Sequence, residues 1–472
     1  MNAKLRTLLA GLTALSVNAH AIDVLRAEQD IFATPGGSIV PVCESSGPPG
    51  RPLLIAEAVE RTLCNNPKTR AAWAVVKAQA ASVGVARAAY LPTISANWQG
   101  VRQSSVVDIE NHPALSEDIN AFTRTASVGL NWLLYDFGAR EAALKSANAL
   151  LDAARATRDA TLQSFFAQAA KDYYTAQTAI AELQAARDVE AMTRESMAAA
   201  QARADRGVVS ITDALQAQTQ HEQAVFSLTK AESDAQAAVG TLAADMNLAP
   251  DVPLDVPPVT EDSRTVPAFG ESVAEMIRDV QATHPSVRAA QAQYEAALAK
   301  VWQTRAQGLP SISLVAKYSR NNQPQSMGLG LATYSSTGHD AYIGVQVSLP
   351  LFEGFGRHYQ VDQAKAQAER QEDAVEDAKQ QVALDVWRSY QTLTGATKNA
   401  GNSANLLGIA QRSWEASKHR YEAGVGNILE LMNTQAALAN AKQQRVQALA
   451  DWNKARIDLA SKLGTLGRED MH

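Results

Sequence analysis

Two turn motifs at a fixed spacing constrain this chain more than any other feature of its sequence. In the second motif, Gly424 can adopt the left-handed conformation that ends a helix, and Asn427 with Glu430 three residues later fits the capping box that begins one. The first motif repeats this arrangement 217 positions earlier, with Gly207 in place of Gly424 and Asp213 in place of Glu430. The chain is therefore predicted to be a tandem repeat, in which the motif is the tip of a long helical hairpin in each copy.

The residues between the tip turns favour long helices. Aromatic residues make up only 6% of the chain, and Ala, Gln, Leu, Glu, Lys and Arg dominate the middle of each half, as is typical of coiled coils. Residues 139–203 contain no proline or glycine, and a helix of that length extends roughly 100 Å. Its apolar residues step alternately by four and three, which is coiled-coil spacing. The second copy, residues 357–421, is similar but is predicted to be interrupted near Gly395 and Gly401.

After each Leu-Pro pair, apolar residues alternate with polar ones, which indicates strands. The four predicted strands cover about residues 93–101, 125–135, 311–319 and 340–350. Each is long enough to cross a bilayer at a tilt, with apolar side chains on one face and polar ones on the other, as in transmembrane β-barrels. Two hairpins packed on a soluble core are the alternative interpretation.

Four strands are too few to close a barrel around a lumen. Open strand edges cannot lie in lipid, because their backbone groups would lack hydrogen-bond partners there. If the strands cross a membrane, several chains must share one barrel, and three chains would supply twelve strands. The predicted fold class is mainly α with a transmembrane β-barrel: long antiparallel coiled-coil helices in two tandem repeats, four strands per protomer, and a twelve-stranded barrel shared by a homotrimer.

The N-terminus predicts export. Lys4 and Arg6 precede a short apolar run, and residues 19–21 fit a signal-peptide cleavage site, so the mature chain is expected to begin at Ile22. No Cys follows that site directly, so lipidation there is not expected. No later stretch of about 18 apolar residues is found, so the exported chain is expected to be either soluble or inserted as a β-barrel.

The chain has two cysteines, Cys43 and Cys64. In an oxidising compartment they could form a disulfide that ties the N-terminal segment to the first helix. Two unpaired thiols are the alternative.

The predicted organisation has six parts. They are a signal peptide at 1–21; an irregular N-terminal segment at 22–52; a first structural repeat at 53–247, with its tip at 203–213; a proline-rich linker at 248–270; a second structural repeat at 271–465, with its tip at 420–433; and a C-terminal tail at 466–472.

The sequence shows none of the motifs on which a prediction of catalysis could be based. HExxH, P-loop, nucleophile-elbow and CxxC patterns are missing, and no histidines have metal-ligand spacing. Gly424 and Gly426 lack the third glycine of a nucleotide-binding fingerprint. The net charge of −6 gives no reason to expect nucleic acid as a partner. The chain is therefore expected to be neither an enzyme nor a protein with a metal or cofactor.

The order and duplication of several short motifs carry a resemblance to a known family. These motifs are Asn66-Pro67, Leu91-Pro92, Leu309-Pro310, Tyr135-Asp136-Phe137-Gly138, Leu351-Phe352-Glu353-Gly354-Phe355-Gly356 and the two tip turns. With the signal peptide and the proline-rich linker, they make the chain resemble the TolC-like outer-membrane factors over nearly its whole mature length.

The resemblance implies a trimeric channel-tunnel in the outer membrane of a Gram-negative bacterium. Its barrel would lie in outer-membrane lipid, and its helices would form a tunnel through the periplasm. A periplasmic adaptor (membrane fusion) protein and an inner-membrane ABC transporter or proton-driven pump would dock at the tips and open the tunnel. Cys43, Cys64 and residues 63–67 look more like the members that serve type I protein secretion. The alternatives are a multidrug efflux duct and, from another class, a soluble periplasmic coiled-coil adaptor.

The resemblance also implies functional residues at the tips. Thr212, Asp213 and Tyr421 fall at positions that form a hydrogen-bonded latch in the closed state, and Glu430 with Asn433 falls at the acidic pair that faces the lumen. Where the family has an arginine, two positions after the second tip glycine, this chain has Gly426.

The charged half of the latch is therefore missing, with Arg203, Arg206 and Arg420 as candidate replacements. Simple capping could also explain Asp213 and Glu430, and Tyr421 could pack at a helix end.

Overall fold

The computed structural model of the chain describes residues 52–112, 116–257, 272–322, 336–464 and 466. The predicted signal peptide, nearly all of the irregular N-terminal segment with Cys43, most of the proline-rich linker and nearly all of the tail lie outside these residues. The chain divides into two compact units, each of which is described by itself. The described part of the first unit comprises residues 77–112, 116–152, 292–322 and 336–373, and that of the second comprises 52–76, 153–257, 272–291, 374–464 and 466.

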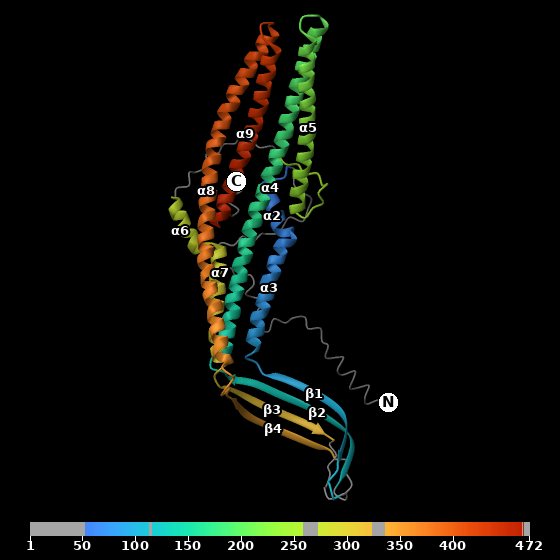
Figure 1. Cartoon of the computed structure of the whole chain (residues 1–472), viewed down its shortest axis with the longest axis vertical. Helices are drawn as coiled ribbons and strands as arrows, with labels where there is room; N and C mark the ends of the chain where they lie inside the picture. Colours follow the sequence, from blue (N-terminus) through green and yellow to red (C-terminus); the bar gives the residue numbers. More distant parts are fainter. Residues whose placement is uncertain (1–51, 113–115, 258–271, 323–335, 465, 467–472) are drawn as a thin grey trace. The chain divides into compact units, whose positions relative to one another are not determined.

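The described elements follow the same order in the two halves of the chain (Figure 1). The first half contains α2 (Ile55–Asn65), α3 (Pro67–Ala88), β1 (Thr93–Val107), β2 (Glu117–Tyr135), α4 (Ala139–Asp205) and α5 (Ile211–Asp245). The second half contains α6 (Val273–Thr283), α7 (Pro285–Ala306), β3 (Ser311–Asn321), β4 (Gly338–Ser348), α8 (Gly356–Glu422) and α9 (Ile428–Leu463). Both α4 and α8 have 67 residues, so the long helices of the two halves match in length.

The helix α8 corrects one expectation, because it runs through Gly395 and Gly401 without interruption. Each glycine lowers helix propensity by about 1 kcal/mol relative to alanine. Neighbouring α8 residues offset this cost through burial: Leu393 and Ala396 pack in a core cluster with α6, α7 and α9. Tertiary packing therefore decides the conformation here, against local propensity.

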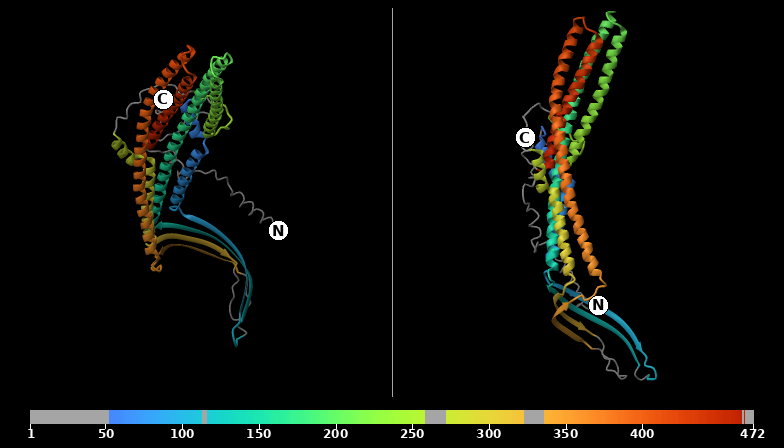
Figure 2. Two further views of the ribbon diagram at one scale, coloured as in Figure 1. Left: turned by 45° about the horizontal axis from the view of Figure 1, so that its top comes forward. Right: turned by 60° about the vertical axis from the view of Figure 1, so that its left-hand side comes forward.

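The first unit contains an antiparallel sheet with the strand order β1-β2-β3-β4, and its strands lie side by side in every view (Figure 2). β2 and β3 pair across the boundary between the two halves, in a register that matches Ser127 with Ser319. Within the part of the chain that the structure describes, β1 and β4 each pair on one side only. The sheet therefore has two open edges.

Strands β1 and β2 are longer than predicted, because their pairing continues into residues 102–124, which lie between the two predicted strands. The register runs from Thr93 opposite Asn131 to Val107 opposite Glu117. Residues such as Gln103 and Ser104 are polar, but main-chain hydrogen bonds do not depend on side-chain hydropathy. Apolar alternation alone therefore finds where β1 begins and where β2 ends, and misses where the hairpin turns.

The register sorts the side chains of all four strands onto two different faces. One face carries Ile94, Ala96, Trp98, Val128, Leu130, Leu314, Ala316, Ile343 and Val345. The opposite face carries Ser95, Asn97, Ser127, Ser313, Lys317 and Gln346. The apolar face is open in the single chain, with Ile94 70%, Trp98 73% and Ile343 75% exposed.

The second unit is held together by small clusters between helices. Leu162 and Phe166 of α4 pack with Val59 and Leu63 of α2 and with Ile457 of α9. Many of the buried positions on the long helices are alanines, which let helix backbones approach closely. Near its tip, the hairpin of α4 and α5 lies beside the hairpin of α8 and α9 (Figures 1 and 2).

Candidate functional site

The candidate site lies at the two tips, where each long helix ends at a glycine in the left-handed conformation. Gly207 has φ +72° and Gly424 has φ +77°, as the sequence predicts for helix stops. Val208 N donates to Arg203 O at 3.0 Å, and Val425 N donates to Arg420 O at the same distance. The two turns are therefore closed by the same backbone bonds.

The next helices begin with side-chain caps. Ser210 Oγ accepts from Thr212 N at 3.1 Å, and Asn427 Oδ1 accepts from Leu429 N at 2.8 Å. The full capping box predicted for Asn427 and Glu430 is wrong, because the Glu430 carboxylate instead lies 3.7 Å from the Arg420 guanidinium. The box is also absent at Ser210 and Asp213, because both N-cap side chains accept from the amide two positions later and not from the one three positions later.

Gly426 is required by a close approach of the backbone. A Cβ at this position would lie 2.7 Å from Tyr421 N and 2.9 Å from Arg420 C. A Cβ atom cannot lie this close to backbone atoms, so any other residue at this position would force the main chain to shift. The turn therefore has no room for the arginine that the TolC-like pattern places here, which is a physical reason for this departure.

Tyr421 is a packed residue in this structure. It is 5% exposed and belongs to a cluster with Ala200, Ala217, Ile428 and Leu431, which joins the two hairpins. Its hydroxyl is buried and has no hydrogen-bond partner among the described residues. The predicted latch bond is therefore not formed within the described part of one chain, and the role of Tyr421 as a latch stays a prediction.

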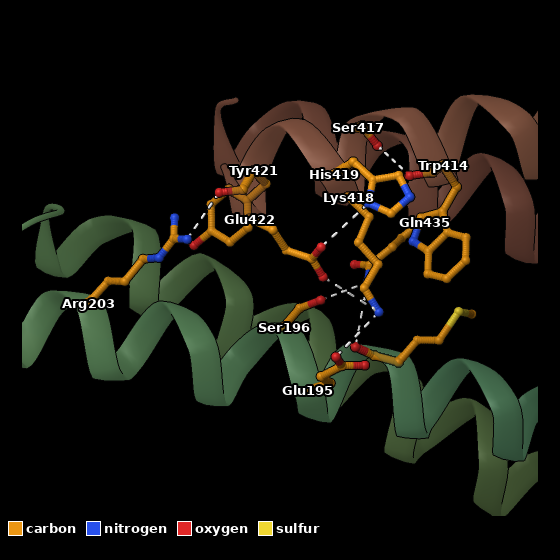
Figure 3. A network of polar contacts seen from close by, with 11 residues as sticks. Glu195, Ser196, Arg203, Trp414, Ser417, Lys418, His419, Tyr421, Glu422 and Gln435 are labelled. Carbon is orange, nitrogen blue, oxygen red and sulfur yellow. Dashed lines mark hydrogen bonds and ion pairs between the residues drawn. The ribbon is translucent and has the colours of Figure 1, made fainter. Parts of the chain in front are cut away.

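Arg203 is the arginine that the structure brings to Tyr421 (Figure 3). Its guanidinium lies 4.2 Å from the centre of the Tyr421 ring, and its Nη2 donates to Tyr421 O at 3.0 Å. A cation over an aromatic face and a charged donor to a carbonyl both favour this arrangement. Of the other two candidates, Arg420 faces Glu430 and Arg206 is exposed.

The remaining predicted residues lie in a different place from Tyr421. Thr212 and Asn433 are exposed and line one surface hollow between α5 and α9, together with Leu429 and Met432. Asp213 is partly buried at the start of α5. The structure thus brings Thr212 near the Asn433 position, while Tyr421 points into the interior of the hairpin pair.

Several polar residues around Tyr421 were not anticipated from the sequence. Gln435 is 4% exposed, and its Nε2 donates to Ser196 Oγ at 2.7 Å. Lys418 Nζ lies 3.3 Å from Glu195 Oε1, across the two hairpins. The available signal was a glutamine on the buried stripe of a helix, where alanine or leucine is expected. Figure 3 shows Gln435 and Lys418 near Trp414, and Tyr421 beside Arg203.

The bases of the hairpins carry titratable groups of opposite behaviour. Burial and a hydrogen bond shared with Asp172 raise the pKa of Asp245 to about 7. Burial would also raise the pKa of Asp458, but hydrogen bonds from Lys171 and Ser389 outweigh it and hold that pKa below its usual value. The base of the first hairpin is thus most stable when Asp245 is protonated. The base of the second hairpin is most stable when Asp458 is ionised.

Cys64 lies near the end of α2 and is disulfide-bonded. Its proposed partner, Cys43, lies outside the described residues. Within the described ranges, no cluster of three or more His, Cys, Asp or Glu side chains is placed to hold a metal ion. In the same ranges, none of the helices combines the length and the apolar character needed to span a bilayer.

The fold is that of outer-membrane channel proteins. The crystal structure of VceC from Vibrio cholerae matches with a TM-score of 0.71 at 19% identity, over 87% of this chain and 96% of that one. The chain belongs to the family described as outer membrane efflux protein, whose profile matches residues 58–247 and 276–465. It is an outer-membrane protein of the Gram-negative type.

Two relatives extend over most of the chain. Protein CyaE of Bordetella pertussis is 31% identical over 418 residues, which are 88% of this chain and 85% of that protein. The alkaline protease secretion protein AprF of Pseudomonas aeruginosa is 24% identical over 421 residues, which are 89% of this chain and 86% of that protein.

Proposed function

We propose that the chain forms a trimeric channel-tunnel that serves as the exit duct of a tripartite export system for proteins, of the type I secretion class. The observation that carries this proposal is the sheet, which has one apolar face, one polar face and two open edges. A lipid-facing barrel wall has this division of faces, with the polar side toward a water-filled lumen.

The open edges support the trimer. In lipid, the unpaired backbone groups of β1 and β4 must find partners, and the edge strands of other copies can provide them. Three copies would supply twelve strands, within the range of known barrels. The long helices of the three chains would then continue the pore through the periplasm.

The proposed cargo class rests on narrower support. AprF is named as an alkaline protease secretion protein and matches this chain over nearly its full length. The disulfide-bonded Cys64 and the segment 63–67 resemble the protein-secretion members. The partners would be a periplasmic adaptor and an inner-membrane ABC transporter. Export of small molecules, with a proton-driven pump as the inner-membrane partner, is the second candidate.

At the tips, Thr212, Asp213 and Tyr421 would latch neighbouring hairpins in the closed state. Because the Tyr421 hydroxyl has no partner within the described part of one chain, its latch partner would come from another conformation or another copy. Glu430, with Asn433 nearby, would contribute one carboxylate per subunit to a ring at the narrow end of the lumen.

Cysteine cross-linking across the edge strands tests the shared barrel. Pairs of cysteines placed on the polar faces of β1 and β4, scanned around Asn97 and Gln346, should yield covalent trimers from outer-membrane fractions. The control pair replaces Ser127 and Ser319, which are opposite each other on β2 and β3, and should cross-link only within one chain. Water-soluble monomers in the periplasmic fraction would instead support the soluble adaptor.

Deletion of the gene separates the two cargo classes. Loss of a secreted protein from the medium, with unchanged susceptibility to drugs and detergents, supports protein secretion. The reverse result supports small-molecule efflux and leaves the channel itself standing.

A further inference from the structure

His284 is the single residue between α6 and α7, and it makes hydrogen bonds to both helices. Its N–H donates to Val280 O of α6 at 2.9 Å. Its carbonyl accepts from Arg288 N at 3.0 Å, which is the first backbone bond of α7. Its imidazole Nδ1 accepts from Ser286 N at 3.2 Å, so the side chain also caps the amino end of α7. We call His284, Pro285 and Ser286 the second joint.

Asn66 occupies the corresponding place in the first half of the chain, 218 positions earlier, between α2 and α3. Its N–H donates to Thr62 O at 3.0 Å, and its carbonyl accepts from Arg70 N at 3.2 Å. Its side-chain Oδ1 accepts from Lys68 N at 2.9 Å. The first joint, residues 66–68, therefore has the same three bonds as the second joint. An amide oxygen accepts at any pH, whereas the Nδ1 of an imidazole accepts only while it carries no proton.

The second joint packs against the end of α9. A Cβ at Gly464, the left-handed C-cap of α9, would lie 3.3 Å from His284 Cδ2 and 3.3 Å from Pro285 Cδ. This burial lowers the pKa of His284, and the nearby charge of Lys462 lowers it further. The ring is therefore neutral at pH 7, as its bond to Ser286 requires.

Two charged residues act on His284 from the helices packed against it. Lys462 of α9 lowers its pKa, and Asp385 of α8 raises it. The carboxylate of Asp385 is already engaged, because one oxygen accepts from Lys462 Nζ at 3.0 Å and the other accepts from Gln381 Nε2 at 3.0 Å. A protonated His284 would therefore have to compete with Lys462 for this carboxylate, so the charged ring gains little from it.

We propose that the second joint is a pH-sensitive switch, in which a proton on Nδ1 of His284 breaks the cap of α7 and loosens the joint from the end of α9. Protonated Nδ1 is a donor, and it would face the N–H of Ser286, which is also a donor. The stability that the cap contributes is present above the usual pKa of histidine, and it is lost as the pH falls through the lowered pKa of His284. The first joint keeps its cap because Asn66 does not titrate. This switch does not depend on whether the chain forms a channel.

Amide hydrogen exchange of the full mature chain in detergent tests the switch, with each rate corrected for the intrinsic effect of pH. Between about pH 7.5 and about pH 4.5, exchange in residues 284–290 should become about fivefold faster, the effect of losing one helix cap. Residues 66–72 are the internal control. Asn66 Nδ2 donates to Asp245 O at 3.3 Å, and the side chain of Asp245 gains a stabilising proton over this range, so exchange there should stay unchanged or slow down. Equal protection of residues 284–290 at the two pH values would overturn the proposal.

Two variants at the same position identify the group responsible. His284→Asn copies the first joint, so residues 284–290 should stay protected at both pH values. If this variant keeps the full pH dependence, a different group such as Asp385 is responsible and the proposal fails. His284→Ala removes the cap altogether, and exchange in residues 284–290 should be about fivefold faster already at about pH 7.5. Unchanged protection in His284→Ala would show that the ring does not cap α7, which would also overturn the proposal.

Discussion

The hairpin of α4 and α5 and the hairpin of α8 and α9 have the same order of helix, turn and helix, and they differ in residues that make specific contacts. Their helices begin at the same spacing, since Ala139 and Gly356 are 217 positions apart, as are Ile211 and Ile428. Both tips have a left-handed glycine and a side-chain N-cap. Local features have therefore been kept in both copies.

The differences lie in residues that make specific contacts, either within one hairpin or between the two. Tyr421 corresponds to Ala204, and Gly426 corresponds to Val209. At the bases, the acidic pair of Asp172 and Asp245 corresponds to Ser389 and Lys462. Each position meets different neighbours in the two hairpins, so residues that make specific contacts differ, while the glycines that end the long helices and the N-caps are present at both tips.

The largest difference between the tips should appear at Gly426. We expect Gly426→Ala to destabilise the second tip by about 2–3 kcal/mol, because the new Cβ meets backbone atoms that cannot rotate away. The corresponding change in the first tip, Val209→Ala, should cost about 1 kcal/mol or less. Amide hydrogen exchange at residues 203–213 and 420–433 measures both. Equal costs would show that the close approach is absent in solution.

The bases should respond to pH in opposite directions. The pKa of Asp245 is raised to about 7, so its contribution to stability is complete below about pH 4 and is lost as the pH rises through about 7. The pKa of Asp458 is lowered. Its contribution to stability is therefore present above the usual pKa of an aspartate, and it is lost as the pH falls through the lowered pKa.

The variant Asp245→Asn stays neutral and can still donate to Asp172. We expect it to remove the loss of stability between about pH 4 and about pH 7, measured as the denaturant midpoint by circular dichroism. Solvent around Asp172 and Asp245 weakens their interaction, so the change in stability is smaller than the pKa shift alone would give. A variant that keeps the full pH dependence would mean that another group is responsible.

Arg203 and Arg420 occupy corresponding positions and are matched controls for each other. Arg203→Met keeps the apolar stem but loses the contact with the Tyr421 ring and carbonyl, so the tip should be destabilised by about 1–2 kcal/mol. Arg420→Met removes an exposed ion pair with Glu430 and should cost about 0–1 kcal/mol. Limited proteolysis of the tips would rank the two variants, and the reverse ranking would disprove the assigned role of Arg203.

The N-caps should be the point where the two tips behave alike. Ser210→Ala and Asn427→Ala each remove one side-chain bond to a helix amide, and each should cost about 1 kcal/mol. Hydrogen exchange at the first turns of α5 and α9 measures this. A large inequality would mean that one cap also makes a contact outside its own turn.

The smallest effect on stability, within about 0.5 kcal/mol, is expected for Glu430→Gln. If Glu430 contributes to a carboxylate ring, this variant should lose preference for cations in planar-bilayer conductance measurements. Asp213→Asn, at the corresponding position of the first hairpin, is the control and should keep that preference. Unchanged selectivity in Glu430→Gln would place the ring elsewhere.

How far prediction reached depended on whether the signal was local. The left-handed glycines, the N-caps and the starts of β1 and β3 follow from residues that are close in sequence. The continuity of α8 through Gly395 did not, because it depends on burial against other helices. The capping box at Glu430 is different, because its residues are close in sequence and it still did not form: Asn427 Oδ1 accepts from Leu429 N, and Glu430 lies beside Arg420 in the same turn.

The sequence by itself determined the duplicated order of elements, the presence of two long helical hairpins and the alternation that makes one face of the sheet apolar. These depend on backbone preference and on periodicity, both of which are read over a few residues. Only the tertiary structure decided which side chains meet, such as Arg203 with Tyr421 or Gln435 with Ser196. Those pairs are more than 200 positions apart, and their contact depends on how two helical surfaces pack, which no local pattern encodes.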